Sequence, residues 1–106
     1  MDMETVFKNM PAAFNGEEAG DLSATVQYKV SAPKYCVIDN GTLTVHDGVS
    51  DNADVTLTLD DDDFIALMTG ELNGMTAFMT GKLQLEGDLM LAQKLSSMFD
   101  ASQLGN

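Results

Sequence analysis

A chain of 106 residues, of which 44% are hydrophobic, is long enough to fold as one domain, residues 1–106, around a single hydrophobic core. Five lysines and arginines against seventeen aspartates and glutamates give a formal net charge of −12. This charge argues against a nucleic-acid partner and against docking on anionic membranes through a basic patch. No apolar run approaches the roughly 18 residues of a membrane-spanning helix, so we expect no stable membrane insertion.

The first part of the chain is predicted to form a helix followed by a strand. Residues 2–14 place apolar side chains along one side of a helix, and we expect Pro11 to end that helix early. Residues 15–20 form a polar connector. Apolar and polar side chains then alternate from 24 to 30, which is typical of a strand with one buried face.

The next predicted element is a β-hairpin. Asn40 and Gly41 are the favoured dipeptide of a two-residue type I′ turn, and they separate strands over 35–39 and 42–46. One face of this register is uniformly apolar, so we expect helices to cover it. That face pairs Ile38 with Leu43 and Cys36 with Val45, whereas the other pairs Tyr35 with His46 and Val37 with Thr44.

The second half of the chain alternates strands with helices. The pattern predicts a strand over 55–59, a helix after the aspartates at 60–63, a short helical segment over 75–80 and a strand over 82–86. Asp88 is a good N-cap for a final amphipathic helix. Four strands that look antiparallel, a fifth strand and the helices form an α+β pair of layers, with the helices over one face of the sheet.

The run of aspartates admits a metal site or a helix cap. Four consecutive carboxylates at a helix start point in different directions, and the sequence lacks the spacing of a calcium loop. We therefore interpret Asp60 as the N-cap and the others as charges favoured by the positive end of the helix dipole. No metal site is expected.

No residues are predicted to be catalytic, and no cofactor is expected. His46 is the single histidine, and the chain has no G-x-S-x-G nucleophile motif. The hairpin register places Cys36 on the apolar face, where a thiol is inert, and His46 beside Tyr35 on the outer face. One cysteine excludes an internal disulfide, and residues 1–9 lack the features of a signal peptide, so we expect a cytoplasmic protein.

Residues 74–99 resemble the most recognisable stretch of the sterol carrier protein 2 (SCP2) domain family, A-F-x-x-G-K-L-x-x-x-G-D-x-x-L-A-x-x-L-x-x-x-F. The matching residues are Ala77, Phe78, Gly81, Lys82, Leu83, Gly87, Asp88, Leu91, Ala92, Leu95 and Phe99. The resemblance extends over residues 53–99 and suggests a small stand-alone member of the bacterial type. It implies a five-stranded, mostly antiparallel sheet with helices covering one face and an apolar tunnel between the layers.

The resemblance also implies non-enzymatic binding or transfer of fatty acyl, isoprenoid or sterol-like chains in that tunnel. Five of the eight methionines lie between residues 65 and 99, which suits an adaptable cavity and equally an ordinary core. We expect the last helix to act as the gate. The predicted tunnel residues are Tyr28, Ile38, Val45, Leu57, Phe64, Met68, Met75, Phe78, Met79, Leu91, Leu95, Met98 and Phe99.

Two assignments stay open at this point. Lys82 is a candidate for contacting a lipid headgroup, or it forms a surface ion pair with Glu86 or Asp88. The alternative function is an accessory or dimerisation module that acts through a homodimer or another protein partner. A large exposed apolar patch would favour that alternative.

Overall fold

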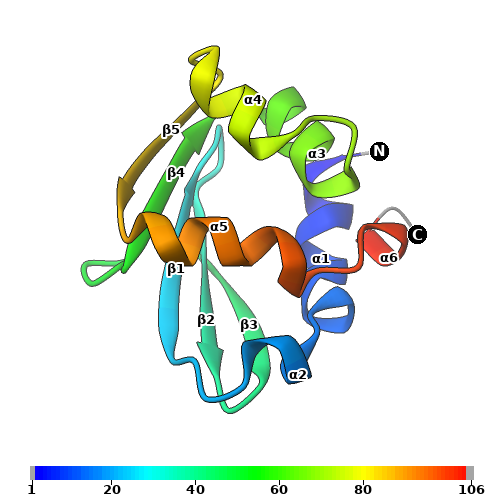
Figure 1. Ribbon diagram of the computed structural model, residues 1–106, viewed down its shortest axis with the longest axis vertical. Coiled ribbons are helices and arrows are strands. Elements are labelled where there is room, and N and C mark those ends of the chain that lie inside the picture. Colours follow the sequence, from blue (N-terminus) through cyan, green and yellow to red (C-terminus); the bar gives the residue numbers. More distant parts are fainter. Residues whose placement is uncertain (1, 105–106) are drawn as a thin grey trace.

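The computed structural model describes residues 2–104, except for the side chains at positions 96, 101 and 102. A five-stranded sheet forms one layer, and helices cover one of its faces (Figure 1), which confirms the predicted α+β class and its two layers. The helices are α1 (Met3–Ala13), α2 (Gly16–Ala19), α3 (Asp61–Thr69), α4 (Gly74–Met79), α5 (Leu89–Met98) and α6 (Ala101–Leu104). The strands are β1 (Ala24–Lys29), β2 (Lys34–Asp39), β3 (Thr42–Asp47), β4 (Val55–Leu59) and β5 (Leu83–Gly87).

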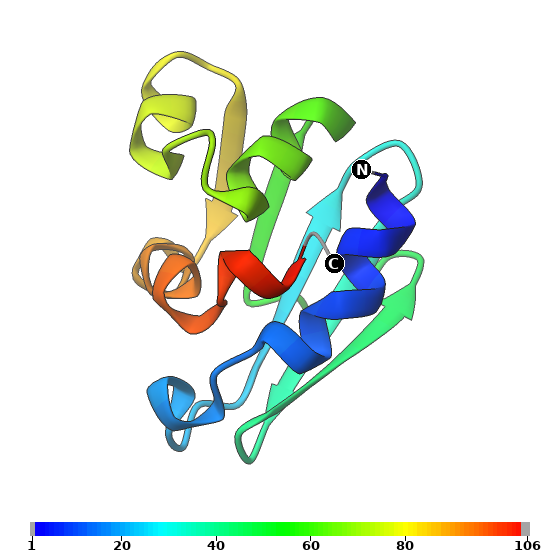
Figure 2. The ribbon, with the colours of Figure 1, turned by 90° about the vertical axis from the view of Figure 1, so that its right-hand side faces the viewer.

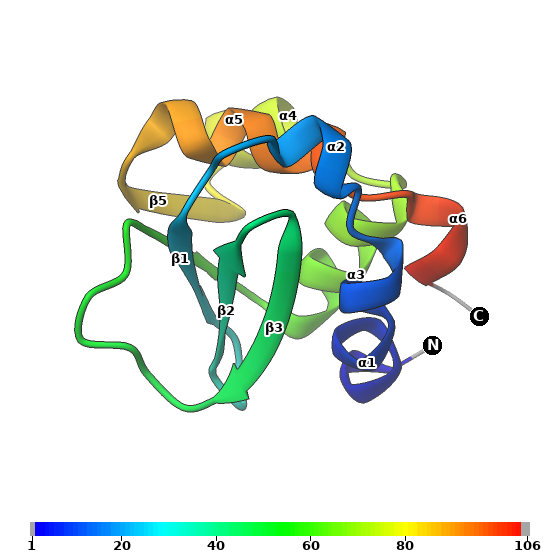
Figure 3. The same ribbon diagram turned by 90° about the horizontal axis from the view of Figure 1, so that it is seen from below.

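The sheet is mixed rather than wholly antiparallel in its first four strands. Its order is β3-β2-β1-β4-β5, and β1 and β4 run parallel while the other three neighbouring pairs are antiparallel. The antiparallel expectation is wrong at β1 and β4, because alternation decides which face a side chain takes and not the direction of a strand. The chain reaches β4 by a loop that crosses the sheet on the face away from the helices (Figure 3).

The β2–β3 hairpin has the predicted register. Ile38 pairs with Leu43 and Cys36 pairs with Val45, as the Asn-Gly turn requires. Asn40 and Gly41 both adopt positive φ, 51° and 75°, which a type I′ turn demands. The apolar face of the hairpin is turned toward α1, so its side chains join the core.

Gln27 in β1 departs from the predicted pattern, because it is 1% exposed although it alternates with the core residues. The loop after β3 covers it. Its Nε2 donates to the carbonyl oxygens of Lys34 and Gly48 at 3.2 and 3.1 Å, and its Oε1 accepts from the amide of Ser50 at 2.7 Å. These bonds satisfy a buried amide and fasten the crossing loop to the back of the sheet.

Three aromatic rings form the centre of the core where α1, β1 and α3 meet. The ring of Phe7 stacks on that of Phe64 with 4.8 Å between centroids, and Tyr28 meets both rings edge-on. All three side chains are buried. Such pairs add to the stabilisation from area burial alone, so this cluster joins the sheet to its helical cover.

Both chain ends contain more helix than the pattern predicts. Pro11 lies inside α1, which continues to Ala13 because Met10 and Ala13 are both buried and packing retains the last turn. The polar connector contains the short helix α2, capped by the side chain of Asn15. Helix α6 follows α5 and packs against α1 and α3 (Figure 2).

The start of α3 is held differently from the prediction. Asp60 occupies the N-cap position, yet its side chain makes no capping bond. The carboxylate of Asp61 instead accepts hydrogen bonds from the amide and the hydroxyl of Ser31. The aspartate run therefore links α3 to the turn after β1, and Asp61 to Asp63 still lie in the first turn, where the helix dipole favours them.

Candidate functional site

The residues predicted to form the floor of a lipid site lie on the helix-covered face of the sheet. Tyr28, Ile38 and Leu57 are buried, and Val45 near the open edge is half-buried. Their placement follows from the hairpin register and from the pairing of Tyr28 with Leu57 across β1 and β4. The sheet therefore presents a continuous apolar surface to its helices.

The residues predicted to form the roof divide into two groups. Phe64, Leu91, Leu95 and Met98 are buried against the sheet, and Met68 and Phe99 are half-buried at the edge of the core. In helix α4 the buried residue is Ala77, which was not among the predicted tunnel residues. The other group, Met75, Phe78 and Met79, therefore lies on the outer surface, outside the interior between sheet and helices.

Leu104 fills part of the interior, and the sequence pattern did not indicate it. Its side chain is fully buried at the C-terminal end of α6, which packs against α1 and α3. The amide nitrogen of the Asn9 side chain donates to the backbone oxygen of Leu104 at 3.0 Å. A single leucine in a polar tail gives no periodicity, so only the neighbouring helices reveal its burial.

The end of α5 is fastened to the segment that follows α1. The amide of Asn15 donates to the oxygen of Met98 at 2.6 Å, and the amide of Asp100 donates to the oxygen of Ala13 at 2.9 Å. Phe14 and Phe99 form an isolated β-bridge, and their rings meet edge-on with 5.7 Å between centroids. Helix α6 begins directly after this strap.

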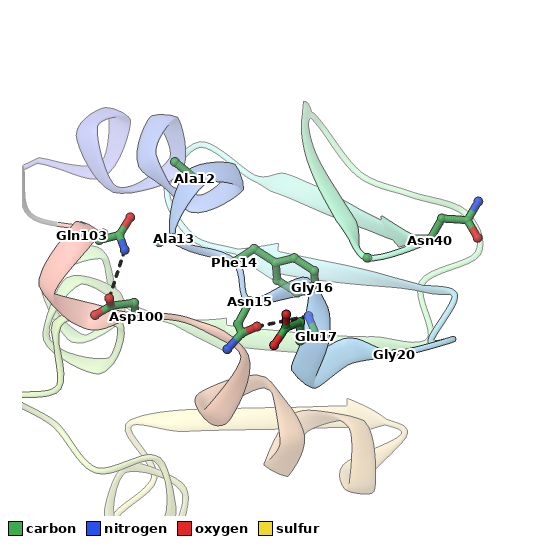
Figure 4. A pocket seen from close by; sticks show the side chains of 11 residues that line it. Ala12, Ala13, Phe14, Asn15, Gly16, Glu17, Gly20, Asn40, Asp100 and Gln103 are labelled. Carbon is green, nitrogen blue, oxygen red and sulfur yellow. Dashed lines mark hydrogen bonds between the residues drawn. The ribbon is translucent and has the colours of Figure 1, made fainter.

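An open hollow of about 650 Å³ lies beside the strap, between the end of α1, α2 and the hairpin tip (Figure 4). Its rim is largely polar; Asn15 accepts from the amide of Glu17, and Gln103 donates to Asp100. Gly16 approaches the hairpin so closely that a Cβ on it would lie 2.4 Å from the oxygen of Gly41. None of the predicted tunnel residues lines this hollow.

A second open hollow contains Lys82. Its walls come from the end of β1, the end of β4 and the start of α3, and they include Lys29 and all four aspartates at 60–63. Among the residues that the structure describes, Lys82 forms no ion pair with Glu86 or Asp88. The side chain of Asp88 instead caps α5 by accepting from the amide of Leu91 at 3.1 Å. The surface ion pair considered for Lys82 is therefore not formed.

The polar groups that could perform chemistry lie apart from this interior or are inert. The ring of His46 stacks on that of Tyr35 on the outer face of the hairpin, as predicted, with 5.1 Å between centroids. Burial raises the pKa of the Cys36 thiol to about 12, so it stays protonated at neutral pH. The described part of the chain holds no cluster of three histidine, cysteine or acidic side chains suited to a metal ion.

None of the helices within residues 2–104 is both long enough and apolar enough to cross a membrane. The buried apolar side chains form one cluster in the interior between the sheet and the helices. Such an interior can take up a long apolar molecule only by exchanging some of its own side-chain contacts for those of the guest.

The chain is similar in sequence to parts of two longer proteins. It is 42% identical over 65 residues to peroxisomal multifunctional enzyme A of Dictyostelium discoideum, covering 61% of this chain and 14% of that protein. It is 43% identical over 61 residues to human sterol carrier protein 2, covering 58% of this chain and 11% of that protein. The chain thus matches only a small part of the length of these relatives.

The fold is also similar to a solved structure of comparable size. Palmitated SCP2L2 from Aedes aegypti, determined in solution, superposes with a TM-score of 0.72 at 28% identity, covering 92% of this chain and 93% of that one. The sequence model of the SCP-2 sterol transfer family matches residues 5–100. With both layers and the characteristic stretch at 74–99 in place, the chain belongs to the SCP-2 sterol transfer family.

Proposed function

We propose that this protein binds a single lipid with a long apolar chain, of the fatty acyl, isoprenoid or sterol-like class, and catalyses no reaction. The observation that carries the proposal is the agreement in fold, over nearly the whole of both chains, with an Aedes protein solved with palmitate. The lipid would lie between the apolar face of the sheet and the helices. Its proposed lining is Tyr28, Ile38, Val45, Leu57, Phe64, Met68, Leu91, Leu95, Met98 and Phe99.

The driving force would be the removal of the lipid chain from water. Each buried methylene contributes about 0.8 kcal/mol, whereas a fully buried leucine contributes about 1.5–3 kcal/mol. Two to four methylenes would therefore offset the displacement of Leu104, by the same figures. A longer chain gains more than the interior loses, so we propose that α6, rather than the strapped helix α5, moves to admit it.

Lys82 is the proposed contact for a polar headgroup. It is exposed on an open hollow and, in the described structure, is not engaged by Glu86 or Asp88. The four aspartates on the same hollow would weaken the attraction of Lys82 for an anionic headgroup. The cytoplasmic location stays a prediction.

Substitution of Leu95 tests the proposal. Leu95 is 6% exposed in α5, and a glutamate there would place a charge in the apolar interior, so Leu95→Glu is expected to abolish uptake of a fluorescent fatty acid. Leu89→Glu is the matched control, because Leu89 lies in the same helix and is 48% exposed. Circular dichroism identifies an unfolded variant. Undiminished uptake by a folded Leu95→Glu protein would contradict the proposal.

A second candidate function is an accessory or dimerisation module. The exposed apolar side chains of α4 favour it, because large exposed apolar patches mark interaction sites. This function requires neither an open interior nor a lipid. Absence of lipid uptake by the wild type, together with binding through α4, would favour the module over the carrier.

A further inference from the structure

Helix α4 presents an apolar face to solvent. Met75, Phe78 and Met79 are 64%, 48% and 76% exposed. They lie at positions i, i+3 and i+4, which share one side of a helix, while Ala77 packs on the core. The core does not account for this face, because Ala77 is the residue that α4 buries in it.

The first turn of α5 also exposes apolar side chains. Leu89 and Met90 are 48% and 68% exposed, and both α4 and α5 pack on β5. Figures 1 and 3 show the two helices over β5, with no segment of the described chain crossing their outer side. We call Met75, Phe78, Met79, Leu89 and Met90 the α4–α5 patch.

Methionine predominates in this patch. Its unbranched thioether adapts to differently shaped partners, and methionine is over-represented on surfaces that accept amphipathic helices. Single exposed apolar residues are ordinary, but five on two helices that pack on the same strand are typical of an interaction site.

Acidic side chains flank both helices of the patch: Asp60 to Asp63 share the second hollow with Gly81 and Lys82, which follow the end of α4, and Asp88 directly precedes Leu89. Residues 60–88 contain seven carboxylates against one lysine, Lys82. All seven are exposed or partly exposed, and they are Asp60, Asp61, Asp62, Asp63, Glu71, Glu86 and Asp88. The chain as a whole carries −12. A partner seated on the patch would therefore meet a negative rim.

We propose that the α4–α5 patch binds a basic amphipathic helix of a partner protein. The apolar side of that helix would cover the methionines and Phe78, and its lysines or arginines would face the carboxylates. A second copy of this chain fits less well because two strongly negative surfaces repel each other. An anionic membrane is disfavoured for the same reason.

A synthetic helical peptide tests this proposal. It carries leucines at i, i+3, i+4 and i+7 with lysines elsewhere, and a control peptide has the same composition in an order that gives no apolar face. We expect the amphipathic peptide to bind the full chain more tightly than the control peptide, with affinity falling as ionic strength rises.

The protein variants locate the site. Phe78→Ser with Met79→Ser is expected to weaken binding about tenfold or more, as removal of central contact residues does. Val49→Ser is the matched control, because Val49 is 61% exposed and lies in the loop on the other side of the sheet. Fatty-acid uptake is measured on the same variants and is expected to be unchanged, which separates this proposal from lipid binding.

Equal affinity for both peptides, or no loss in the double variant, would overturn the proposal. Self-association that is lost in the double variant, without peptide binding, would assign the patch to a second copy instead. Binding to vesicles of neutral phosphatidylcholine, lost in the same variant and again without peptide binding, would assign it to a membrane surface.

Discussion

Leu104→Ala tests whether a bound lipid displaces the side chain of Leu104 or whether Leu104 is an ordinary core residue. Leu104 is fully buried between α1 and α3. Truncation of a buried leucine lowers the free energy of unfolding by about 2–5 kcal/mol, and α6 is terminal and able to settle into the space, so we expect about 2–3 kcal/mol. Chemical denaturation of the lipid-free protein measures this loss.

The same substitution should strengthen lipid binding. If an incoming chain displaces Leu104, the wild type gives up the contacts of that side chain on binding, and Leu104→Ala no longer does so. Each 1.4 kcal/mol recovered tightens the dissociation constant about tenfold, so about 2 kcal/mol corresponds to roughly thirtyfold. Titration with a fluorescent fatty acid measures the dissociation constant, and Leu89→Ala on the exposed side of α5 is the control.

The substitution is expected to lower the free energy of unfolding and to tighten lipid binding, and few other causes produce both changes. A general loosening of the core would lower stability and weaken binding together. Unchanged or weaker binding by a folded, destabilised Leu104→Ala protein would refute the reasoning that lipid and α6 compete for the same space.

Two further predictions concern the sheet and α3. Gln27→Leu leaves the amide of Ser50 and two carbonyls without their partner and should lower the unfolding free energy by about 2 kcal/mol. Urea titration measures this loss. Gln84→Leu, at an exposed position of β5, should leave the unfolding free energy nearly unchanged, and an equal loss in both variants would contradict the role given to Gln27. The hydrogen bonds from Ser31 lower the pKa of the Asp61 carboxyl below its ordinary 3.8. Its contribution to stability is therefore present above pH 3.8 and lost as the pH falls through the lowered pKa. Asp61→Asn should reduce the acid dependence of the denaturation midpoint in that window, and an unchanged dependence would show that this carboxylate does not contribute.

Local sequence signals predicted those elements whose geometry depends on neighbouring residues. The Asn40-Gly41 dipeptide fixed the hairpin register because few residues accept positive φ at both turn positions. The strand over 55–59 followed from alternation, and Asp88 marked the start of α5 by its capping bond to Leu91. In each case the determinant lies within a few residues of its effect.

The features that were missed depend on distant parts of the chain. The burial of Gln27 requires the loop after β3, and the parallel pairing of β1 with β4 requires the route of that loop. The burial of Leu104 requires α1 and α3.

Composition alone also could not place the methionines. It does not distinguish one in the core, such as Met98, from one on the surface, such as Met79. Burial therefore followed the expected faces on the sheet, where alternation assigns them, but not on α4.

The most direct test of lipid binding is native mass spectrometry of the purified protein, followed by organic extraction and identification of what is released. The account predicts one equivalent of a long-chain fatty acid, isoprenoid or sterol-like lipid, lost when Leu95 is replaced by glutamate and retained when Leu89 is. An unliganded wild-type protein that also takes up no fluorescent fatty acid would contradict it.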